Sequence, residues 1–172
     1  MESRAKFLGH GIHPLMIVFP LGLLSTSVIF DVIYLVTGRT GFTVASAYAI
    51  AAGLIGGAVA GLFGFVDYLA VPPKTRARRV GALHGGGNVL VLTLFAVSWL
   101  LRLDQADWAP SGLAIGFSLT GAALAGVTGW LGGELVERHG VSVADDAGLN
   151  APSSLSQLRT RGGRRVGRPR TP

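Results

Sequence analysis

Four long apolar segments constrain the fold of this chain more than any other feature of its sequence. Each is about 20 residues or longer, the length at which an α-helix crosses roughly 30 Å of hydrocarbon. Charged residues make up only 14% of the 172 residues, too few for an ordinary soluble domain of this size. The sequence therefore predicts an all-α fold, a bundle of four transmembrane helices. The predicted spans are residues 14–36, 42–69, 80–101 and 113–135.

Basic residues near the ends of the spans predict the orientation of the bundle. Lys and Arg are retained on the cytoplasmic side during insertion, and an even number of spans brings both termini to one side. Both termini are therefore predicted to be cytoplasmic. The residues on that side are Arg4, Lys6, Lys74, Arg76, Arg78, Arg79 and Arg138, against Arg39 and Arg102 in the other two loops.

The composition changes after Val143, which separates a membrane domain at residues 1–143 from a basic tail at 144–172. Such a tail cannot bury a core, so it is expected to be disordered. Arginines beside a bilayer most simply bind anionic lipid headgroups. Nucleic-acid binding is the weaker alternative, because no aromatic residue interrupts the run for base stacking. The arginines of the tail are Arg159, Arg161, Arg164, Arg165, Arg168 and Arg170.

Polar residues gather at one edge of the predicted bundle. All four histidines fall near the cytoplasmic ends of apolar segments, where other polar groups join them. Asn88 follows His84 by four residues and therefore shares its helix face. The residues of this edge are His10, His13, His84 and His139, with Asp67, Asn88 and Glu134.

Several kinds of chemistry fit this edge. A divalent metal could be coordinated by His10, His13, Asp67, His84 and His139. A haem b could instead be held between His13 and His84, with Arg78 or Arg79 pairing with its propionates. The third interpretation is purely structural: interfacial His, Asp and Asn side chains often cap helix ends, so the absence of any cofactor is the default expectation. Because the chain has no cysteine, thiolate metal sites are excluded.

Small residues on two spans predict close helix packing. Glycines recur every fourth residue on the second and fourth spans, which keeps them on one stripe of each helix and lets another backbone approach. Internal packing is the preferred interpretation and an interface between subunits the alternative. The stripes comprise Gly53, Gly57 and Gly61 on the second span and Gly129 and Gly133 on the fourth.

Three further residues carry expectations of their own. Pro20 lies about two turns into the first span and should bend it. Asp31, near the outer end of the same span, is expected to cap a neighbouring helix, with a proton path as the alternative. Glu134 and Arg138 stand four residues apart and are expected to form a surface ion pair.

Several motifs together resemble a known family. They read GHGIHP at residues 9–14, FP at 19–20, GFVDY at 64–68 and GWLGGEL at 129–135, ahead of HGV at 139–141. In these motifs the chain resembles domain-of-unknown-function family twenty-two thirty-one, small predicted bacterial membrane proteins. The resemblance covers about residues 8–143 and implies a multi-pass protein of the bacterial inner membrane. It implies no established activity, although fusion of some relatives to Rieske-type domains hints at redox work.

The sequence favours an accessory or scaffolding component of a membrane assembly over an enzyme. The polar edge would then dock a membrane-protein partner or a second copy of the chain, or stabilise the fold. The alternative is a redox module that binds haem or metal through its clustered histidines. No nucleophile with a base, phosphate loop or inverted repeat points to catalysis or transport.

Overall fold

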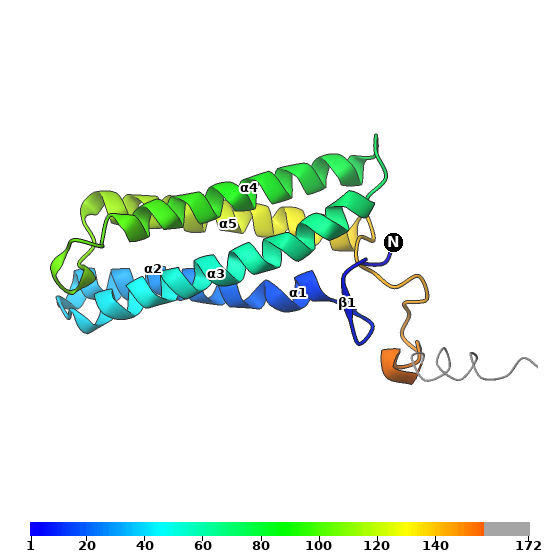
Figure 1. Ribbon diagram of the computed structural model, residues 1–172, viewed down its shortest axis with the longest axis horizontal. Coiled ribbons are helices and arrows are strands. Elements are labelled where there is room, and N and C mark those ends of the chain that lie inside the picture. Colours follow the sequence, from blue (N-terminus) through cyan, green and yellow to red (C-terminus); the bar gives the residue numbers. More distant parts are fainter. Residues whose placement is uncertain (157–172) are drawn as a thin grey trace, which may run out of the picture.

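The computed structural model describes residues 1–156 and shows four long antiparallel helices, the first of them broken (Figure 1). The predicted all-α bundle is confirmed. The predicted basic tail begins at 144, and its arginines at 159–170 lie outside the described residues. The elements are β1 (Lys6–Phe7), β2 (His10–Gly11), α1 (Ile12–Met16), α2 (Val18–Thr37), α3 (Gly41–Ala70), α4 (Arg76–Leu100), the short η1 (Ala106–Trp108) and α5 (Gly112–Glu137).

The first span is divided into α1 and α2 at Ile17. A proline has no N–H, so Pro20 cannot donate to the carbonyl of Met16 four residues earlier. The helix is interrupted at Ile17, the residue directly after Met16, although the N–H of Ile17 still donates to His13 O at 3.1 Å. The helix is thus interrupted close to Pro20, and the bend itself stays a prediction. α1 is a separate turn that carries His13.

The remaining helices begin and end with recognisable local signals. Gly38 closes α2 in the left-handed conformation, with φ of 67° and its N–H bonded to Tyr34 O. Side-chain caps start the last two helices: Thr75 Oγ1 accepts from the N–H of Arg78, and Ser111 Oγ accepts from the N–H of Ala114. The connections between consecutive helices are short, so neighbouring helices run antiparallel.

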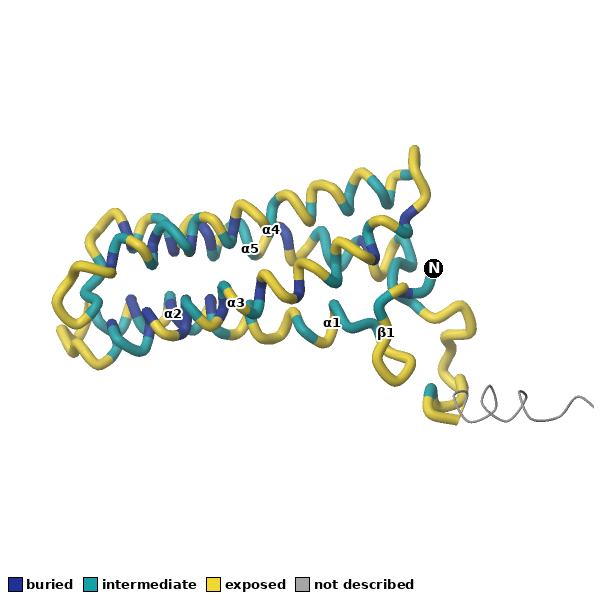
Figure 2. The backbone as a smooth tube through the Cα atoms, viewed as in Figure 1, coloured by how far each residue is buried: buried dark blue, intermediate teal, exposed yellow. Residues whose placement is uncertain are grey.

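The helices are arranged as two tight pairs. α2 packs along α3, and α4 packs along α5, with fewer contacts between the pairs. The compact apolar core of Leu24, Ile50, Val91 and Phe95 lies between them. Figure 2 shows the buried positions facing inward and exposed positions along the outside.

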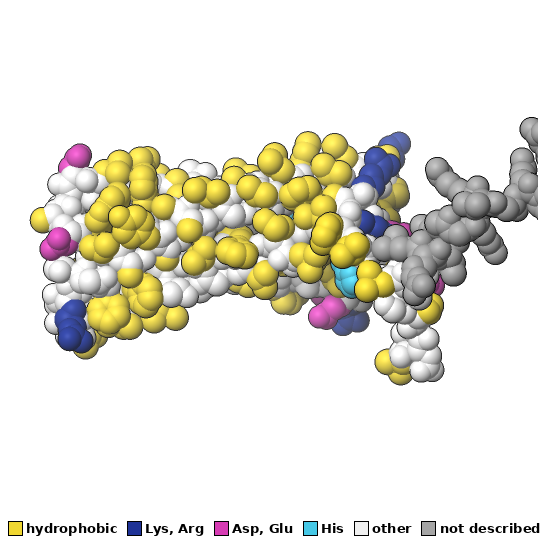
Figure 3. All heavy atoms as spheres, turned by 60° about the horizontal axis from the view of Figure 1, so that its bottom comes forward, with side chains coloured by type: hydrophobic (Ala, Val, Ile, Leu, Met, Phe, Trp, Pro, Cys, Tyr) yellow, Lys and Arg dark blue, Asp and Glu magenta, His cyan; other side chains and the backbone are white. Residues whose placement is uncertain are grey.

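The outer surface of the bundle is apolar along its length. Ile55 is 69% exposed and Leu62 is 68% exposed. Figure 3 shows hydrophobic side chains covering the body, with charged side chains at its two ends. All four helical segments of the described chain are long and apolar enough to cross a membrane. Lipid is the solvent that makes such a surface stable, because its hydrocarbon does not oppose exposed apolar side chains.

The two ends of the bundle differ in what they contain. We call one the terminal end: it holds residues 1–11, the α3–α4 turn at 71–75 and the residues that follow α5 (Figure 1). The opposite end, the far end, holds the α2–α3 turn at 38–40 and the connection at 101–111.

The predicted glycine stripes are only partly packing surfaces. A Cβ at Gly53 would lie 2.7 Å from Leu24, and one at Gly57 would lie 2.6 Å from Leu92, so helices do approach closely there. A Cβ at Gly61, Gly129 or Gly133 would meet no atom within 4 Å. Close packing within the chain is therefore absent at these three glycines, and the alternative of an interface between subunits stays a prediction.

Candidate functional site

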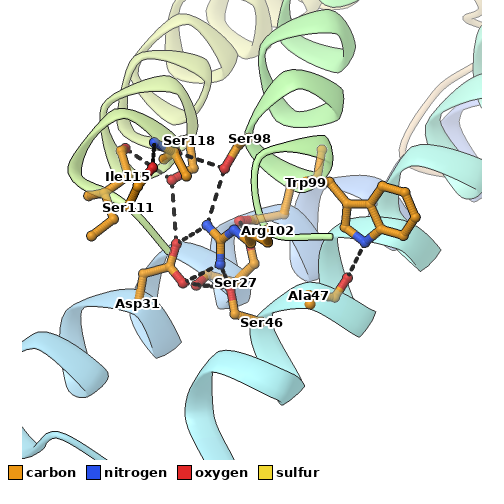
Figure 4. Close-up of polar contacts among 12 residues, drawn as sticks. Ser27, Asp31, Ser46, Ala47, Ser98, Trp99, Arg102, Ser111, Ile115 and Ser118 are labelled. Carbon is orange, nitrogen blue, oxygen red and sulfur yellow. Dashed lines mark hydrogen bonds and ion pairs between the residues drawn. The ribbon is translucent and has the colours of Figure 1, made fainter. Parts of the chain in front are cut away.

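At the far end an ion pair is buried between the helices. Arg102, just beyond α4, donates from Nη1 to Oδ1 of Asp31 at 2.8 Å and from Nη2 to Oδ2 at 2.6 Å. Figure 4 shows this two-pronged contact from α2 to the end of α4. Arg102 is 0% exposed and Asp31 is 1% exposed. The expected role of Asp31 as a helix cap is wrong, because its carboxylate neutralises a buried guanidinium.

Serines from three helices complete this ion pair. Ser46 Oγ on α3 donates to Asp31 Oδ1 at 2.7 Å and accepts from Arg102 Nη1 at 3.1 Å. Ser98 Oγ on α4 accepts from Nη2 at 3.1 Å, and Ser118 Oγ on α5 lies 3.4 Å from Asp31 Oδ2. Buried charges are tolerated when they are paired and hydrogen-bonded. Full burial and complete pairing of the carboxylate give this cluster a structural role, in which it holds four helices together.

Near the terminal end, two histidines from different helix pairs face each other. His13 on α1 and His84 on α4 have ring centroids 6.4 Å apart, with their planes at 88°. Nδ1 of His13 lies 2.8 Å from Ala60 O on α3, and Nδ1 of His84 lies 2.8 Å from Thr128 O on α5. A carbonyl oxygen only accepts, so Nδ1 carries the hydrogen in both rings. In an imidazole that carries one hydrogen, Nε2 then has the lone pair.

Both imidazole rings lie against the same local feature, a backbone carbonyl followed four residues later by a glycine. The carbonyl of Ala60 is followed four residues later by Gly64, and the carbonyl of Thr128 is followed four residues later by Gly132. On a helix, the side chain of residue n+4 lies next to the carbonyl of residue n. A Cβ at Gly64 would lie 2.8 Å from Nδ1 of His13, and one at Gly132 would lie 3.0 Å from Cε1 of His84. Each glycine therefore opens the helix surface to an imidazole.

Asn88 ties the second of these histidines to α5. Its Nδ2 donates to His84 O at 2.8 Å and lies 3.3 Å from Nε2 of the ring, while its Oδ1 accepts from Thr128 Oγ1 at 3.1 Å. A Cβ at Gly87 would lie 2.5 Å from Cγ2 of Thr128, so α4 and α5 are in close contact here. The face shared by His84 and Asn88 is thus the face that packs against α5.

Asp67 has a different task from the histidines. Ser3 Oγ donates to it, within 2.8 Å of both carboxylate oxygens, and the N–H groups of Arg4 and Ala5 donate to Oδ1 at 2.8 and 3.3 Å. Asp67 and Ser3 are each 6% exposed. The carboxylate therefore fastens the N-terminal segment onto the end of α3.

The other residues of the predicted polar edge do not join the histidine pair. His10 lies exposed in β2, and Nε2 of His139 is buried with no hydrogen-bond partner among the described residues. Within residues 1–156 no group of three or more His, Cys, Asp or Glu side chains is placed to hold a metal. The predicted five-residue metal site of His10, His13, Asp67, His84 and His139 is therefore wrong, since its members have separate surroundings.

One predicted interaction between charged residues is also wrong, and another stays a prediction. No ion pair forms between Glu134 and Arg138 in the described chain; only their backbones meet, through Arg138 N and Glu134 O at 3.1 Å. The Arg78 guanidinium donates to Tyr68 O at 2.6 Å and to Val71 O at 3.0 Å. These contacts hold the Arg78 guanidinium at the end of α3, and the pairing of Arg78 or Arg79 with a haem propionate stays a prediction.

Sequence reasoning missed Arg102, Gly64 and Gly132. Arg102 was counted as a loop residue because it follows an apolar span. The available signal was that Asp31 stands inside an apolar span, where a carboxylate needs a buried cation. Gly64 and Gly132 each follow, by four residues, a residue that lies at the same depth in the membrane as a histidine. Helix periodicity alone does not distinguish these two glycines from the other glycines.

Comparison with known proteins gives one match. Residues 9–145 match the family described as predicted membrane protein, domain of unknown function 2231 (DUF2231). The chain belongs to this family. The match agrees with the four helices that are long and apolar enough to cross a membrane. Neither the curated proteins nor the solved structures compared with the DUF2231 chain gave a match.

Proposed function

We propose that this DUF2231 protein is a membrane-embedded haem-binding module in which His13 and His84 would hold the haem. The observation that carries the proposal is the opposed pair of imidazoles, one from each helix pair, with ring centroids 6.4 Å apart. Both Nδ1 atoms are held by backbone carbonyls, the arrangement that commonly orients metal-binding histidines. Nε2 of His84 lies 3.3 Å from Asn88 Nδ2, so a haem would have to displace this contact.

The separation of the rings supports one iron between them. Two nitrogens bonded to one ion at about 2.0–2.1 Å each, the usual metal–imidazole distance, hold the ring centroids roughly 6 Å apart. The two ring planes stand at 88° to each other, in an edge-to-face contact. A porphyrin supplies the other four ligands. Two histidines therefore suffice for a haem, whereas a non-haem metal needs further protein ligands near this pair.

The surroundings of the pair support the same group. Gly64 and Gly132 lie directly against the two rings, so small residues on α3 and α5 make room for the imidazoles themselves. A haem held there would supply one-electron transfer. Both histidines lie toward the terminal end, so electrons would be exchanged on that side of the membrane.

Absorption spectroscopy tests the proposal directly. Protein purified from cells supplied with a haem precursor should show a Soret band and about one haem per chain. His13→Ala and His84→Ala should each abolish the band. Gly132→Ala should reduce it, because the added methyl meets the His84 ring. His10→Ala is the matched control, since His10 is exposed and outside the pair, and it should keep the band.

Two results would overturn this function. One is wild-type protein that is folded by circular dichroism yet colourless under these conditions. The other is full haem content in both His13→Ala and His84→Ala. Elemental analysis on the same samples separates haem iron from a haem-free metal.

A specific observation also favours the accessory role inferred from sequence. Asp67, Asn88 and Thr128 all find hydrogen-bond partners inside the chain, so much of the polar edge maintains the fold. In an accessory component the histidines would do the same. That function predicts a colourless protein in which His84→Ala lowers the unfolding free energy by about 1–2 kcal/mol and changes nothing else.

A further inference from the structure

We propose that the α3–α4 turn at the terminal end is a binding site for anionic phospholipid headgroups, formed by Lys74, Arg76 and Arg79. All three side chains are exposed. Among the described residues none of the three forms an ion pair. Three positive charges within six residues therefore lack a negative partner in this part of the protein.

The fourth basic residue of the turn explains why these three are free to bind. Arg78 lies over the ring of Tyr68, 3.9 Å from its centroid, and donates to the last carbonyls of α3. Thr75 fixes the other side of the turn by accepting from Arg78 N and donating to Pro72 O. One arginine thus holds the turn in shape while its neighbours project from a fixed backbone.

The charges in the first turn of α4 favour the binding of an anion from outside the chain. The first turn of the helix contains no acidic residue. The amino end of a helix is its positive end, so the arginines there add repulsion that a bound anion would relieve. The basic side chains, rather than the helix end by itself, define the site.

The position of the turn selects a lipid over a soluble anion. Leu69 on α3 and Leu83 on α4, 53% and 65% exposed, continue the apolar outer surface toward the turn. A phospholipid places its phosphate at the membrane surface directly above hydrocarbon. Cations at the end of an apolar helix surface match both parts of that molecule.

Lipid retention by the full-length protein tests the site. Protein in detergent is titrated with phosphatidylglycerol or with phosphatidylcholine of the same acyl chains, and bound lipids are counted by native mass spectrometry. Wild type should prefer phosphatidylglycerol. The triple variant Lys74→Gln/Arg76→Gln/Arg79→Gln should bind it about 10- to 100-fold more weakly, from about fivefold per basic side chain near an anionic surface.

Matched variants identify the cause of any loss. Arg39→Gln removes an exposed charge at the far end and should leave lipid binding unchanged, while Arg76→Lys/Arg79→Lys keeps the charges and should retain most of it. The arginines at 159–170 are present in every protein compared, so their contribution cancels. Equal phosphatidylglycerol binding by wild type and the triple variant would overturn the site. So would full competition by glycerol phosphate at the same concentration, which would assign the turn to a soluble anion.

Discussion

A guanidinium withdrawn from water needs a compensating negative charge, and Arg102 finds it in Asp31. Removing one member of such a pair leaves the other buried and uncompensated, whereas replacing both by apolar residues removes the desolvation cost of both. Ser46 and Ser98 add hydrogen bonds to the pair. The energetic importance of either residue therefore depends on whether its partner is still present.

Arg102→Met should lower the unfolding free energy by about 3–5 kcal/mol, because Asp31 loses its only buried cation. The double variant Asp31→Leu/Arg102→Met should recover most of that loss. Unfolding in mixed micelles, followed by tryptophan fluorescence, measures both changes. Arg39→Gln, an exposed arginine at the same end, serves as the control and should change stability by less than about 0.5 kcal/mol. A single variant as stable as wild type would show that the ion pair contributes nothing.

At the scale of elements, local sequence signals decide where helices begin and end, while contacts between distant segments decide what their ends do. Pro20 breaks the first span and Thr75 caps α4 through rules that operate within a few residues. The N-terminal segment is different. It is ordered because Asp67, more than 60 residues away along the chain, accepts hydrogen bonds from Ser3, Arg4 and Ala5.

Asp67→Asn should release the N-terminal segment while the bundle stays folded. Hydrogen bonds to a charged acceptor contribute about 1.5–3 kcal/mol, so amide exchange in residues 4–12 should become about 10- to 100-fold faster. Hydrogen–deuterium exchange with peptide-level mass spectrometry measures this change. Glu137→Gln is the control, since Glu137 is an exposed carboxylate at the same end. Unchanged exchange in Asp67→Asn would mean that packing, not this carboxylate, holds the segment.

At the scale of the whole molecule, the antiparallel helices place the N-terminus, the residues that directly follow α5 and the α3–α4 turn at one end. Basic residues favour the cytoplasmic side, so the orientation inferred from sequence stays a prediction that this end of the bundle is cytoplasmic. Under that orientation the histidine pair lies toward the cytoplasm and the Asp31–Arg102 ion pair toward the outer face.

Cysteine labelling can determine the orientation, because the chain has no cysteine of its own. A membrane-impermeant maleimide applied to intact spheroplasts should label Thr40→Cys, in the α2–α3 turn, and should label Lys74→Cys only after lysis. Labelling of Lys74→Cys in intact spheroplasts, with Thr40→Cys protected, would place both termini outside the cytoplasm.

The sequence by itself determined the number of helices, their approximate bounds, the break at Pro20 and the end at which the histidines gather. These features follow from apolar length, proline chemistry and helix period, which act locally along the chain. Only the tertiary structure decided which polar groups meet: that His13 faces His84, that Asp67 binds the N-terminal segment, and that Arg102 turns inward to Asp31. Such pairings depend on the rotation and depth of each helix against its neighbours. The helix surfaces of this chain are almost uniformly apolar, so the periodicity of the sequence does not indicate how each helix is rotated. Only the packed structure shows that rotation.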